Sequence, residues 1–370
     1  MKRKVEINKY TGCLLGGAIG DALGAPIEFM DINTIKNRFG SAGITDYVEH
    51  PNHVGEFTDD TQMTLFTAEG LLRAQNRATL KGIGGATVTI TYQSYLRWLH
   101  TQGISTDHLD FGWGDMDLDS GWLIKEKALH RTRAPGNTCL ESLRRGLSLS
   151  PDRPINNSKG CGAVMRMAPV GFAYYDLPGT FNLGCELGEL THGHPSGYLS
   201  AGVLAAIIEQ LIDGASLREA LDAVLPHLQS RPDHEEVLCA VNETIRLANQ
   251  VDSDRGDRQM QVENAINQLG QGWVAEEALA ISVFCSLVFE NDFEAGVLAA
   301  VNHSGDSDST GSITGNILGL INGEQAFPQR WIRNLKSADL VRQVGEDLFS
   351  WCKSDSFNSD QEWWEKYPGF

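Results

Sequence analysis

A short stretch near the end of the sequence core carries two carboxylates two residues apart, followed at once by hydroxyl side chains. The stretch is His303–Gly311, and its oxygen-bearing residues include Asp306, Asp308, Ser309 and Thr310. Carboxylate and hydroxyl oxygens are the ligands that hard divalent cations select in proteins. This spacing therefore indicates a Mg²⁺ or Mn²⁺ site.

The residues that follow, 312–319, are apolar at helical spacing and almost uncharged, which predicts a loop leading into the N-terminus of a buried helix. Unpaired N–H groups and the helix dipole favour anions there, but burying bare carboxylates is costly without a cation or several donors. Ordinary helix capping by Asp, Ser and Thr is the alternative. An EF-hand is excluded, because its twelfth position requires Glu and is Ile317 here.

A second acidic cluster, Thr58-Asp59-Asp60, precedes another apolar pattern at helical spacing, over residues 63–72. Asp60 and Asp306 are 246 residues apart (306 − 60), yet both clusters are expected at helix N-termini. Like charges repel unless a cation lies between them. We therefore expect the two clusters to face each other across metal ions.

The first predicted helix, residues 10–25, has glycines at close to a four-residue period and ends before Pro26. On a helix these glycines form one stripe that allows another backbone to approach closely. Asp21 interrupts the stripe, which argues against a membrane helix pair, and no G-K-[ST] follows to make a phosphate loop. Asp21 is interpreted as a satisfied buried polar group rather than a catalyst, and Glu28 follows just beyond the proline.

Two further segments carry polar groups at predicted helix starts. The pattern of residues 156–169 predicts a loop that leads into a helix. The small residues of this loop can bind a phosphate through their N–H groups or simply form a tight turn. His192 and His194 resemble a zinc pair, but no third ligand lies at a recognisable spacing, so polar contacts at a helix start are expected. Ser196 is the expected cap of that helix.

Composition excludes several classes of protein. The 370-residue chain is 41% hydrophobic and 21% charged, with a net charge of −18, which argues against nucleic acid or an anionic membrane as partner. Seven scattered cysteines without C-x-x-C suit a reduced, cytoplasmic protein. No stretch of about 18 apolar residues occurs, so no membrane span is predicted. We expect a monomer.

Helical spacing recurs throughout the chain, and few segments alternate with period two. No low-complexity linker divides the sequence, and the two acidic clusters lie at its opposite ends. We therefore predict an all-α fold, a single compact orthogonal helical domain over residues 1–370, with core motifs in 10–322 and a helical, aromatic tail in 323–370. The other segments predicted to be helical are 88–101, 196–208, 215–225, 234–248, 275–289 and 291–301, with 250–262 as a charged surface connection.

Five ordered segments make the chain resemble the ADP-ribosylglycohydrolase family, and in particular its bacterial dinitrogenase-reductase type. They are G-C-L-L-G-G-A-I-G-D-A-L-G-A-P-I-E, G-E-F-T-D-D-T-Q-M, K-G-C-G-A-V-M-R-M-A-P, T-H-G-H-P and H-S-G-D-S-D-S-T-G. The resemblance implies an all-α fold around a binuclear centre with two Mg²⁺ or Mn²⁺ ions. The metal ligands that it implies are Thr58, Asp59, Asp60, Asp306, Asp308 and Ser309, the last being Thr in many relatives.

The resemblance also implies where the substrate lies. Glu28 matches an acidic residue near the scissile ribose, and the loop Ser158–Met165 matches the loop on the diphosphate side. His192 matches a position ahead of a helix that borders the ligand. Cys161 stands where relatives often have Asn, so its contact is open. The implied substrate-binding residues are Ser158, Gly160, Cys161, Gly162, Met165 and His192.

The implied chemistry is hydrolysis at the anomeric carbon of ADP-ribose through an oxocarbenium-like state. Two metals fix the ribose hydroxyls and hold a water, and a nearby carboxylate moves the proton. Glu28, Asp60 and Asp308 are the candidate catalytic carboxylates, and the sequence does not choose between them. The expected substrate is an ADP-ribosylated protein or a small ADP-ribose conjugate.

The motifs and the acidic charge favour arginine as the acceptor, with serine, O-acetyl-ADP-ribose or a nucleic-acid end as alternatives. Trp113, with Asp110 and Asp115, is a candidate for holding the guanidinium by stacking and charge, although this loop also fits a purely structural role. A second class of function is an immunity protein that binds a toxin partner through its surface. Prenyl-diphosphate lyases and HD-type phosphohydrolases fit poorly, because D-D-x-x-D and a set of histidine ligands are both absent.

Overall fold

The described chain is built from helices, as predicted. The computed structural model describes residues 6–48, 54–82, 84–106, 109, 117–147, 154–173, 176–251, 257–353 and 361–369, and no strand occurs among them. The α-helices are α1 (Ile7–Gly24), α2 (Ile32–Phe39), α3 (Asp59–Lys81), α4 (Thr87–Thr101), α5 (Asn137–Arg145), α6 (Leu177–Glu189), α7 (Pro195–Ile212), α8 (Leu217–Gln229), α9 (Glu235–Ala248), α10 (Arg258–Leu269), α11 (Ala275–Val288), α12 (Phe293–Val301), α13 (Ser307–Asn322), α14 (Gln329–Asn334), α15 (Ala338–Lys353) and α16 (Gln361–Lys366). Five short 3₁₀ helices join them, at Leu123–Lys125, Lys127–Leu129, Cys161–Arg166, Ala168–Phe172 and Glu324–Ala326.

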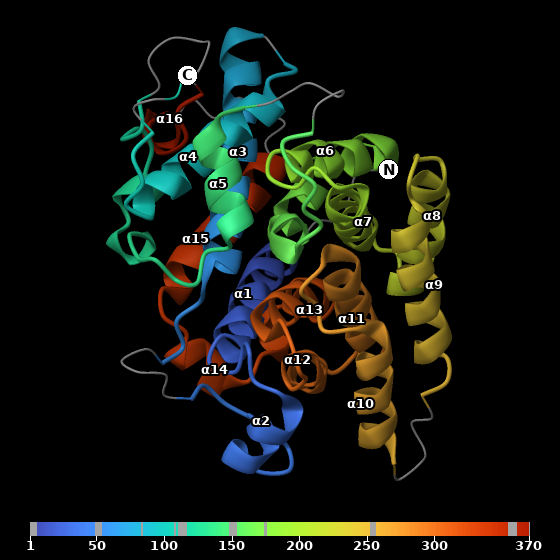
Figure 1. Cartoon of the computed structure of the whole chain (residues 1–370). Coiled ribbons are helices and arrows are strands. Elements are labelled where there is room, and N and C mark those ends of the chain that lie inside the picture. Colours follow the sequence, from blue (N-terminus) through green and yellow to red (C-terminus); the bar gives the residue numbers. More distant parts are fainter. Residues whose placement is uncertain are drawn as a thin grey trace.

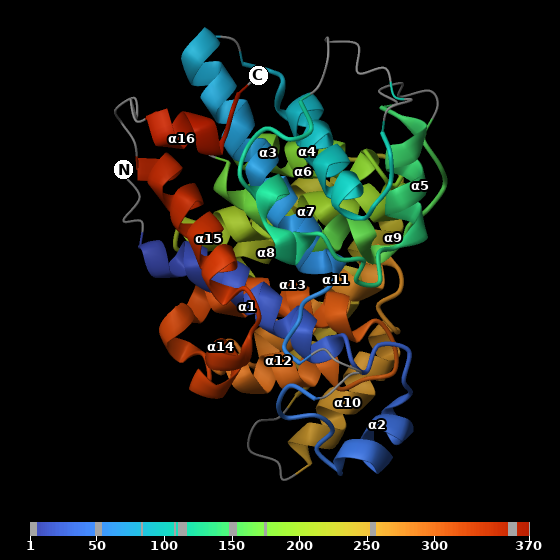
Figure 2. The same ribbon diagram turned by 90° about the vertical axis from the view of Figure 1, so that its left-hand side faces the viewer.

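Helices α1 and α13 lie side by side at the centre of the molecule (Figures 1 and 2) and run antiparallel. Their glycines meet in register, because a Cβ on Gly16 would lie 2.2 Å from the Gly315 carbonyl oxygen and one on Gly20 would lie 1.9 Å from that of Gly311. The predicted glycine stripe therefore does allow a close backbone approach. Its partner is the helix that follows the acidic stretch, so this contact joins the two ends of the chain.

Gly20→Ala is expected to lower the free energy of unfolding of the metal-free protein by at least about 3 kcal/mol, because the added methyl overlaps backbone that cannot move aside. Urea unfolding followed by circular dichroism measures this change. Gly84→Ala is the control, since a Cβ there meets nothing within 4 Å, and its stability should change by no more than about 1 kcal/mol. Equal stability of the two variants would contradict the close contact.

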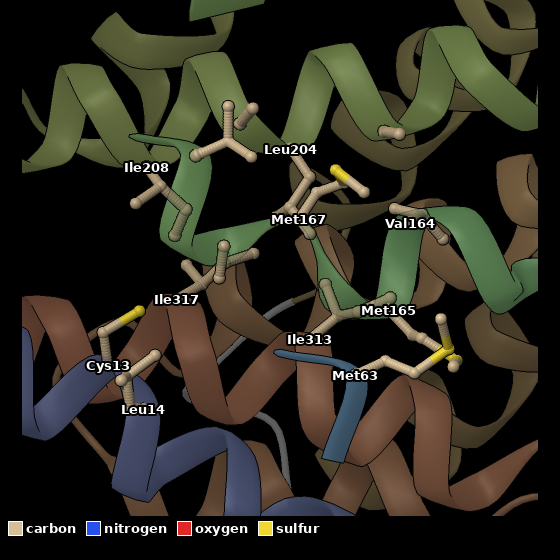
Figure 3. Close-up of a cluster of buried hydrophobic side chains, with 14 of the residues drawn as sticks. Cys13, Leu14, Met63, Val164, Met165, Met167, Leu204, Ile208, Ile313 and Ile317 are labelled. Carbon is tan, nitrogen blue, oxygen red and sulfur yellow. The ribbon is translucent and has the colours of Figure 1, made fainter. Parts of the chain in front are cut away.

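The hydrophobic core surrounds this central pair. Figure 3 shows Cys13 and Leu14 of α1, Ile313 and Ile317 of α13, and side chains from α7 and the two 3₁₀ helices at 161–172 packed together. Helix α7 is long and apolar enough to cross a membrane by length and composition, but 83% of that window is buried inside the protein, as expected of a core helix. The apolar character of α7 is therefore explained by its burial in the hydrophobic core.

Several boundaries differ from the prediction for local reasons. Helix α7 begins at Pro195, and its N-cap is His194, whose Nδ1 accepts from the Ser196 N–H at 3.1 Å, so Ser196 is not the cap. The histidines thus make polar contacts at a helix start. Residues 161–172 form 3₁₀ turns rather than an α-helix. The last part of the supposed connection 250–262 already belongs to α10.

The aromatic tail packs back onto the chain. Tyr367 is fully buried and donates through its hydroxyl to Asp347 Oδ2 at 2.6 Å. Trp363 donates to Asn76 Oδ1 at 3.0 Å, so α16 is held against α3 as well as α15. The tail therefore covers the far end of the helix whose N-terminus carries Asp59 and Asp60.

Candidate metal centre and active site

The acidic cluster Thr58-Asp59-Asp60 is fixed at the N-terminus of α3. Thr58 is the N-cap, and its side chain accepts from the Asp60 N–H. Asp21, fully buried on α1, accepts from the Thr58 N–H at 2.9 Å and from the Thr61 N–H and hydroxyl at 3.0 and 2.5 Å. This carboxylate satisfies the free donors of the first turn. Asp21 is therefore a satisfied buried polar group that positions the second cluster.

The other acidic cluster occupies the N-terminus of α13. Asp306 is the N-cap, and its Oδ1 accepts from the Ser309 N–H at 3.3 Å, while Asp308 Oδ1 accepts from the same group at 3.0 Å. Both carboxylates are about 3% exposed. The helix begins five residues earlier than expected, so Asp308 lies within its first turn rather than in a preceding loop.

Glu28 completes a compact acidic group. Helix α1 ends at Gly24, and the following turn brings Glu28 beside the start of α13. One carboxylate oxygen each from Glu28, Asp306 and Asp308 lie within 4.8 Å of one another. This separation suits oxygens around a single divalent cation. Of the five predicted carboxylates, Asp59 and Asp60 lie outside this compact group.

The two clusters nevertheless meet. The carboxylate of Asp308 on α13 lies close enough to the N-terminus of α3 for its charge to act on both aspartates there. Burial, and next the negative charge of Asp308, raise the pKa of Asp59 and of Asp60 well above the usual range of a carboxyl. Residues nearly 250 positions apart in the sequence, Asp60 and Asp308 (308 − 60 = 248), therefore share one electrostatic environment, while the metal ions expected between them stay a prediction.

The residues present fit a divalent cation. Asp60 Oδ1 is buried and has no hydrogen-bond partner among the described residues, although a buried carboxylate oxygen normally has one. Burial, followed by repulsion from Asp308 and Asp306, raises the pKa of Glu28 to about 10. A set of buried carboxylates with too few donors requires positive charge, and carboxylate and hydroxyl oxygens are what Mg²⁺ and Mn²⁺ accept.

The metal-free protein is expected to lose stability as the pH rises from 5 to 8. The folded-state pKa of Asp21 is raised from 3.8 to about 7, chiefly by burial and then by the Asp308 charge, so the folded protein retains a proton that the unfolded chain has lost. Stability falls with pH wherever the folded state binds more protons. Glu28 extends this window upward. Chemical unfolding at several pH values, with a chelator present, measures the slope.

Metal should reverse this trend, because it binds the ionised carboxylates and releases their protons. The stabilisation by Mn²⁺ at a fixed concentration should therefore be larger at pH 8 than at pH 5. A metal-induced stabilisation that shrinks with rising pH would contradict the assignment of these carboxylates as ligands.

The loop at residues 133–136 contacts Asp59, and no sequence motif predicts this contact. The Arg133 carbonyl accepts from the Asp59 N–H at 3.1 Å, and the Gly136 N–H donates to Asp59 Oδ2 at 3.3 Å. Between them Ala134 adopts a left-handed backbone with φ of 52°, which is costly for a residue with a side chain. The segment therefore fixes the orientation of Asp59 from outside α3.

Cys161 lies directly against the acidic centre. Its thiol donates to Asp306 Oδ2 at 2.8 Å and accepts from the Ser309 hydroxyl at 3.6 Å. Burial, followed by the charges of Asp306 and Asp60, raises the pKa of this thiol well above its usual range, so it acts as a neutral donor. Its contact, left open by the sequence, is therefore with a predicted metal ligand.

The loop that contains Ser158, Gly160 and Gly162 lies against His192. A Cβ on Gly160 would come 3.4 Å from His192 Nε2, and one on Gly162 would come 3.0 Å from its ring. His192 is buried and shares a hydrogen bond with the Thr191 hydroxyl through Nδ1, and burial lowers its pKa to about 3, so the ring is neutral. The role of this loop as a diphosphate site stays a prediction.

Some backbone N–H groups of this loop already donate hydrogen bonds within the protein. The Gly160 N–H donates to Ser158 Oγ at 3.3 Å, and the Cys161 N–H donates to the Trp273 carbonyl at 3.2 Å. Met165 is 3% exposed and packs in the core, with its sulfur 4.0 Å from the Ser309 hydroxyl. The role of Met165 in substrate binding stays a prediction. Trp113, Asp110 and Asp115 lie outside the described residues.

A pair of aromatic rings borders the centre and was not predicted. Phe29, next to Glu28, is 76% exposed and has a left-handed backbone with φ of 67°. Its ring stacks on Trp273 with centroids 5.0 Å apart. The carbonyl of Gln271, two residues before Trp273, accepts from the Asp306 N–H at 2.8 Å. The strained backbone turns Glu28 towards the acidic group and Phe29 towards solvent.

Known proteins resemble this chain in sequence and in fold. The chain is 24% identical to the ADP-ribosylarginine hydrolase Tri1 of Serratia proteamaculans, over 95% of this chain and 82% of that protein. It is 22% identical to the ADP-ribosyl-(dinitrogen reductase) glycohydrolase of Rhodospirillum rubrum, over 91% and 94% of the two chains. A solved ADP-ribosylglycohydrolase-related protein complex has the same fold, with a TM-score of 0.64, 23% identity and coverage of 94% of this chain and 98% of its own.

The family model for ADP-ribosylglycohydrolase matches residues 2–356, which is nearly the whole chain. The match includes both helix N-termini that carry the acidic clusters, as well as the loop at Cys161 and the turn at Glu28. The chain is thus a member of the ADP-ribosylglycohydrolase family of enzymes.

Proposed function

We propose that this enzyme is a metal-dependent hydrolase that removes ADP-ribose from arginine side chains of modified proteins. The relatives named above act, by their names, on ADP-ribosylarginine and on ADP-ribosylated dinitrogen reductase. The observation that carries the proposal is the compact acidic group of Glu28, Asp306 and Asp308 at the N-terminus of α13, whose charge also acts on the buried Asp59 and Asp60 of α3. Few structural roles require so much negative charge in one buried place.

Two Mg²⁺ or Mn²⁺ ions are the cations that we assign to this group. The residues that would hold them are Thr58, Asp59, Asp60, Asp306, Asp308 and Ser309. When bound, such ions orient the ribose hydroxyls and stabilise the charge that develops at the reacting centre. Cys161 then keeps Asp306 in place through its thiol hydrogen bond, and Asp21 keeps the first turn of α3 in place.

Glu28 is the residue that we assign to proton transfer. It is the only member of the compact acidic group that is not at a helix N-terminus, and it lines a pocket of about 250 Å³ together with Thr58, Glu56 and Arg133. Burial, and next the charges of Asp308 and Asp306, raise the pKa of Glu28 in the metal-free protein, and a perturbed pKa of this kind supports a role in proton transfer. A carboxylate at this position accepts the proton of the attacking water and returns one to the leaving group.

A side-by-side substrate comparison tests the acceptor. The purified enzyme is offered ADP-ribosyl-arginine, ADP-ribosyl-serine and O-acetyl-ADP-ribose with Mg²⁺, and the release of ADP-ribose is followed by chromatography. We expect the arginine conjugate to have the highest kcat/KM. Faster cleavage of the serine conjugate would retire arginine as the acceptor, and no metal-dependent release from any of the three would refute the hydrolase itself.

A further inference from the structure

A second pocket lies apart from the acidic centre, between α2, α10 and α12. Both views place these helices next to one another at one end of the molecule (Figures 1 and 2). The pocket has a volume of about 310 Å³, within the range of small-ligand sites. Much of its wall is apolar, with Val262 and Ile266 from α10 and Leu298 and Ala299 from α12. The dimensions suit a short apolar chain.

The charged groups of this pocket have a net positive charge. Lys36 and Arg258 line it, and Glu263 is its one acidic residue among the described lining residues. Lys36 Nζ is 2.6 Å from Glu263 Oε2, so the charges of these two residues cancel. Arg258 has no acidic partner among the described ion pairs: its Nη2 donates to the Val288 carbonyl at 2.9 Å. The uncompensated charge is therefore that of Arg258.

Arg258 also has an unused donor. Its Nε is buried and has no acceptor within the described part of the chain, and its guanidinium lies 4.6 Å above the centroid of the Phe289 ring. A buried N–H without an acceptor is uncommon and costs stability. An anionic oxygen placed at this end of the pocket would pair with the guanidinium that borders it and balance its charge.

We propose that this pocket is a binding site for a small carboxylate with a short apolar tail. The carboxylate pairs with Arg258, and the tail lies along Val262, Leu298 and Ala299. The net positive charge of the lining favours an anion over an amine.

The pocket is connected to the acidic centre through the start of α2. Ile32, a lining residue at the start of α2, donates its N–H to Ser304 Oγ at 2.8 Å, two residues before Asp306. Asn302, another lining residue, accepts from the Ile44 N–H at 2.8 Å and donates to its carbonyl at 3.0 Å, which ties the segment after α2 to the end of α12. A ligand that fills the pocket holds α2 against α10 and α12, and with it the turn that carries Glu28. Occupation should therefore strengthen metal binding.

Calorimetry with octanoate as the probe tests the site directly. The full-length protein should bind one octanoate with a Kd of about 1 mM or tighter, while octylamine, which has the same tail and the opposite charge, should bind at least about tenfold more weakly. No binding of octanoate, or equal binding of the amine, would overturn the proposal. This readout does not depend on hydrolase activity, so its failure leaves the proposed function untouched.

Two variants locate the probe. Arg258→Met removes the guanidinium but keeps most of the side-chain length, and it should weaken octanoate binding at least about tenfold. Ala299→Phe fills the pocket and should abolish binding. Arg246→Met is the matched control, because Arg246 is an exposed arginine on α9 that pairs only with Glu243 among the described residues. Unchanged affinity in Arg258→Met and Ala299→Phe would place octanoate elsewhere and overturn the assignment.

The coupling has its own test. Saturating octanoate should tighten Mn²⁺ binding by at least about threefold, and Mn²⁺ should tighten octanoate binding by the same factor, because coupling between two binding sites is reciprocal. Ala299→Phe at the same octanoate concentration corrects for any Mn²⁺ bound by octanoate in solution. An Mn²⁺ affinity that octanoate leaves unchanged in the wild-type protein would overturn the coupling.

Discussion

Asp308→Asn is expected to abolish the metal response of the protein and, at the same time, to make the metal-free protein more stable at pH 8. After burial, the charge of Asp308 is the strongest influence that raises the pKa of Glu28, Asp21, Asp59 and Asp60. Removing this charge should raise the free energy of unfolding of the metal-free protein by an amount on the order of 1 to 2 kcal/mol, the equivalent of roughly one pKa unit.

The metal response is lost because Asp308 lies between the two clusters. The wild-type protein should gain about 2.7 kcal/mol at a metal concentration 100 times the Kd. At about 2.1 cal/mol/K of unfolding entropy per residue, this gain raises Tm by roughly 3 to 4 °C. Asp308→Asn and Asp308→Ala should show no such shift and no metal-dependent hydrolysis. Thermal unfolding with and without Mn²⁺, together with an ADP-ribose release assay, measures both effects.

Two outcomes would count against this account. Unchanged metal-dependent hydrolysis in Asp308→Ala would mean that the two helix N-termini do not share a metal centre. A metal-free Asp308→Asn that is less stable than the wild type at pH 8 would mean that the carboxylate is stabilised in the folded protein. Asp339→Asn is the control, since Asp339 is exposed at the start of α15 and pairs only with Arg342 among the described residues.

The central architecture could be predicted because its signals are local. A four-residue glycine period, as at Gly16 and Gly20, has one efficient use on a helix, which is a close contact with another backbone. Acidic and hydroxyl residues directly before an apolar helical pattern predict a charged N-terminus, as at Asp59 and Asp306. Two such N-termini far apart in sequence are most simply reconciled by a shared cation. Each of these steps depends on a few adjacent residues.

The supporting contacts could not be predicted, because they join segments without a recognisable pattern. Nothing near Arg133 or Gly136 indicates that this loop holds Asp59, and the strain at Ala134 appears only in three dimensions. The same is true of Phe29, whose exposed ring is explained by its stacking on Trp273. The sequence predicts that Asp21 is a satisfied buried polar group, but only the fold identifies its partner, the first turn of α3.

The second of the largest effects concerns Glu28. Glu28→Gln keeps the size and hydrogen-bonding shape of the side chain but removes its ability to accept a proton. If Glu28 moves the proton, kcat should fall by about 10²-fold or more at saturating metal, while the protein folds normally and still binds ADP-ribose. Glu56→Gln is the matched control: it lines the same pocket, but its oxygens face Arg131 and Arg133, so its kcat should change little.

Metal affinity must be measured in the same variant, because one oxygen of Glu28 lies within 4.8 Å of oxygens of Asp306 and Asp308. A loss of kcat that excess Mn²⁺ restores would assign Glu28 to metal binding, whereas a loss that persists at saturating Mn²⁺ assigns it to proton transfer. The pH dependence of kcat separates the two roles further. If Glu28 transfers the proton, the fall of kcat at low pH, where the base is protonated, should disappear in Glu28→Gln; if Glu28 only binds metal, this fall should remain. A variant with full kcat at every metal concentration would show that Glu28 serves only the packing of the turn after α1.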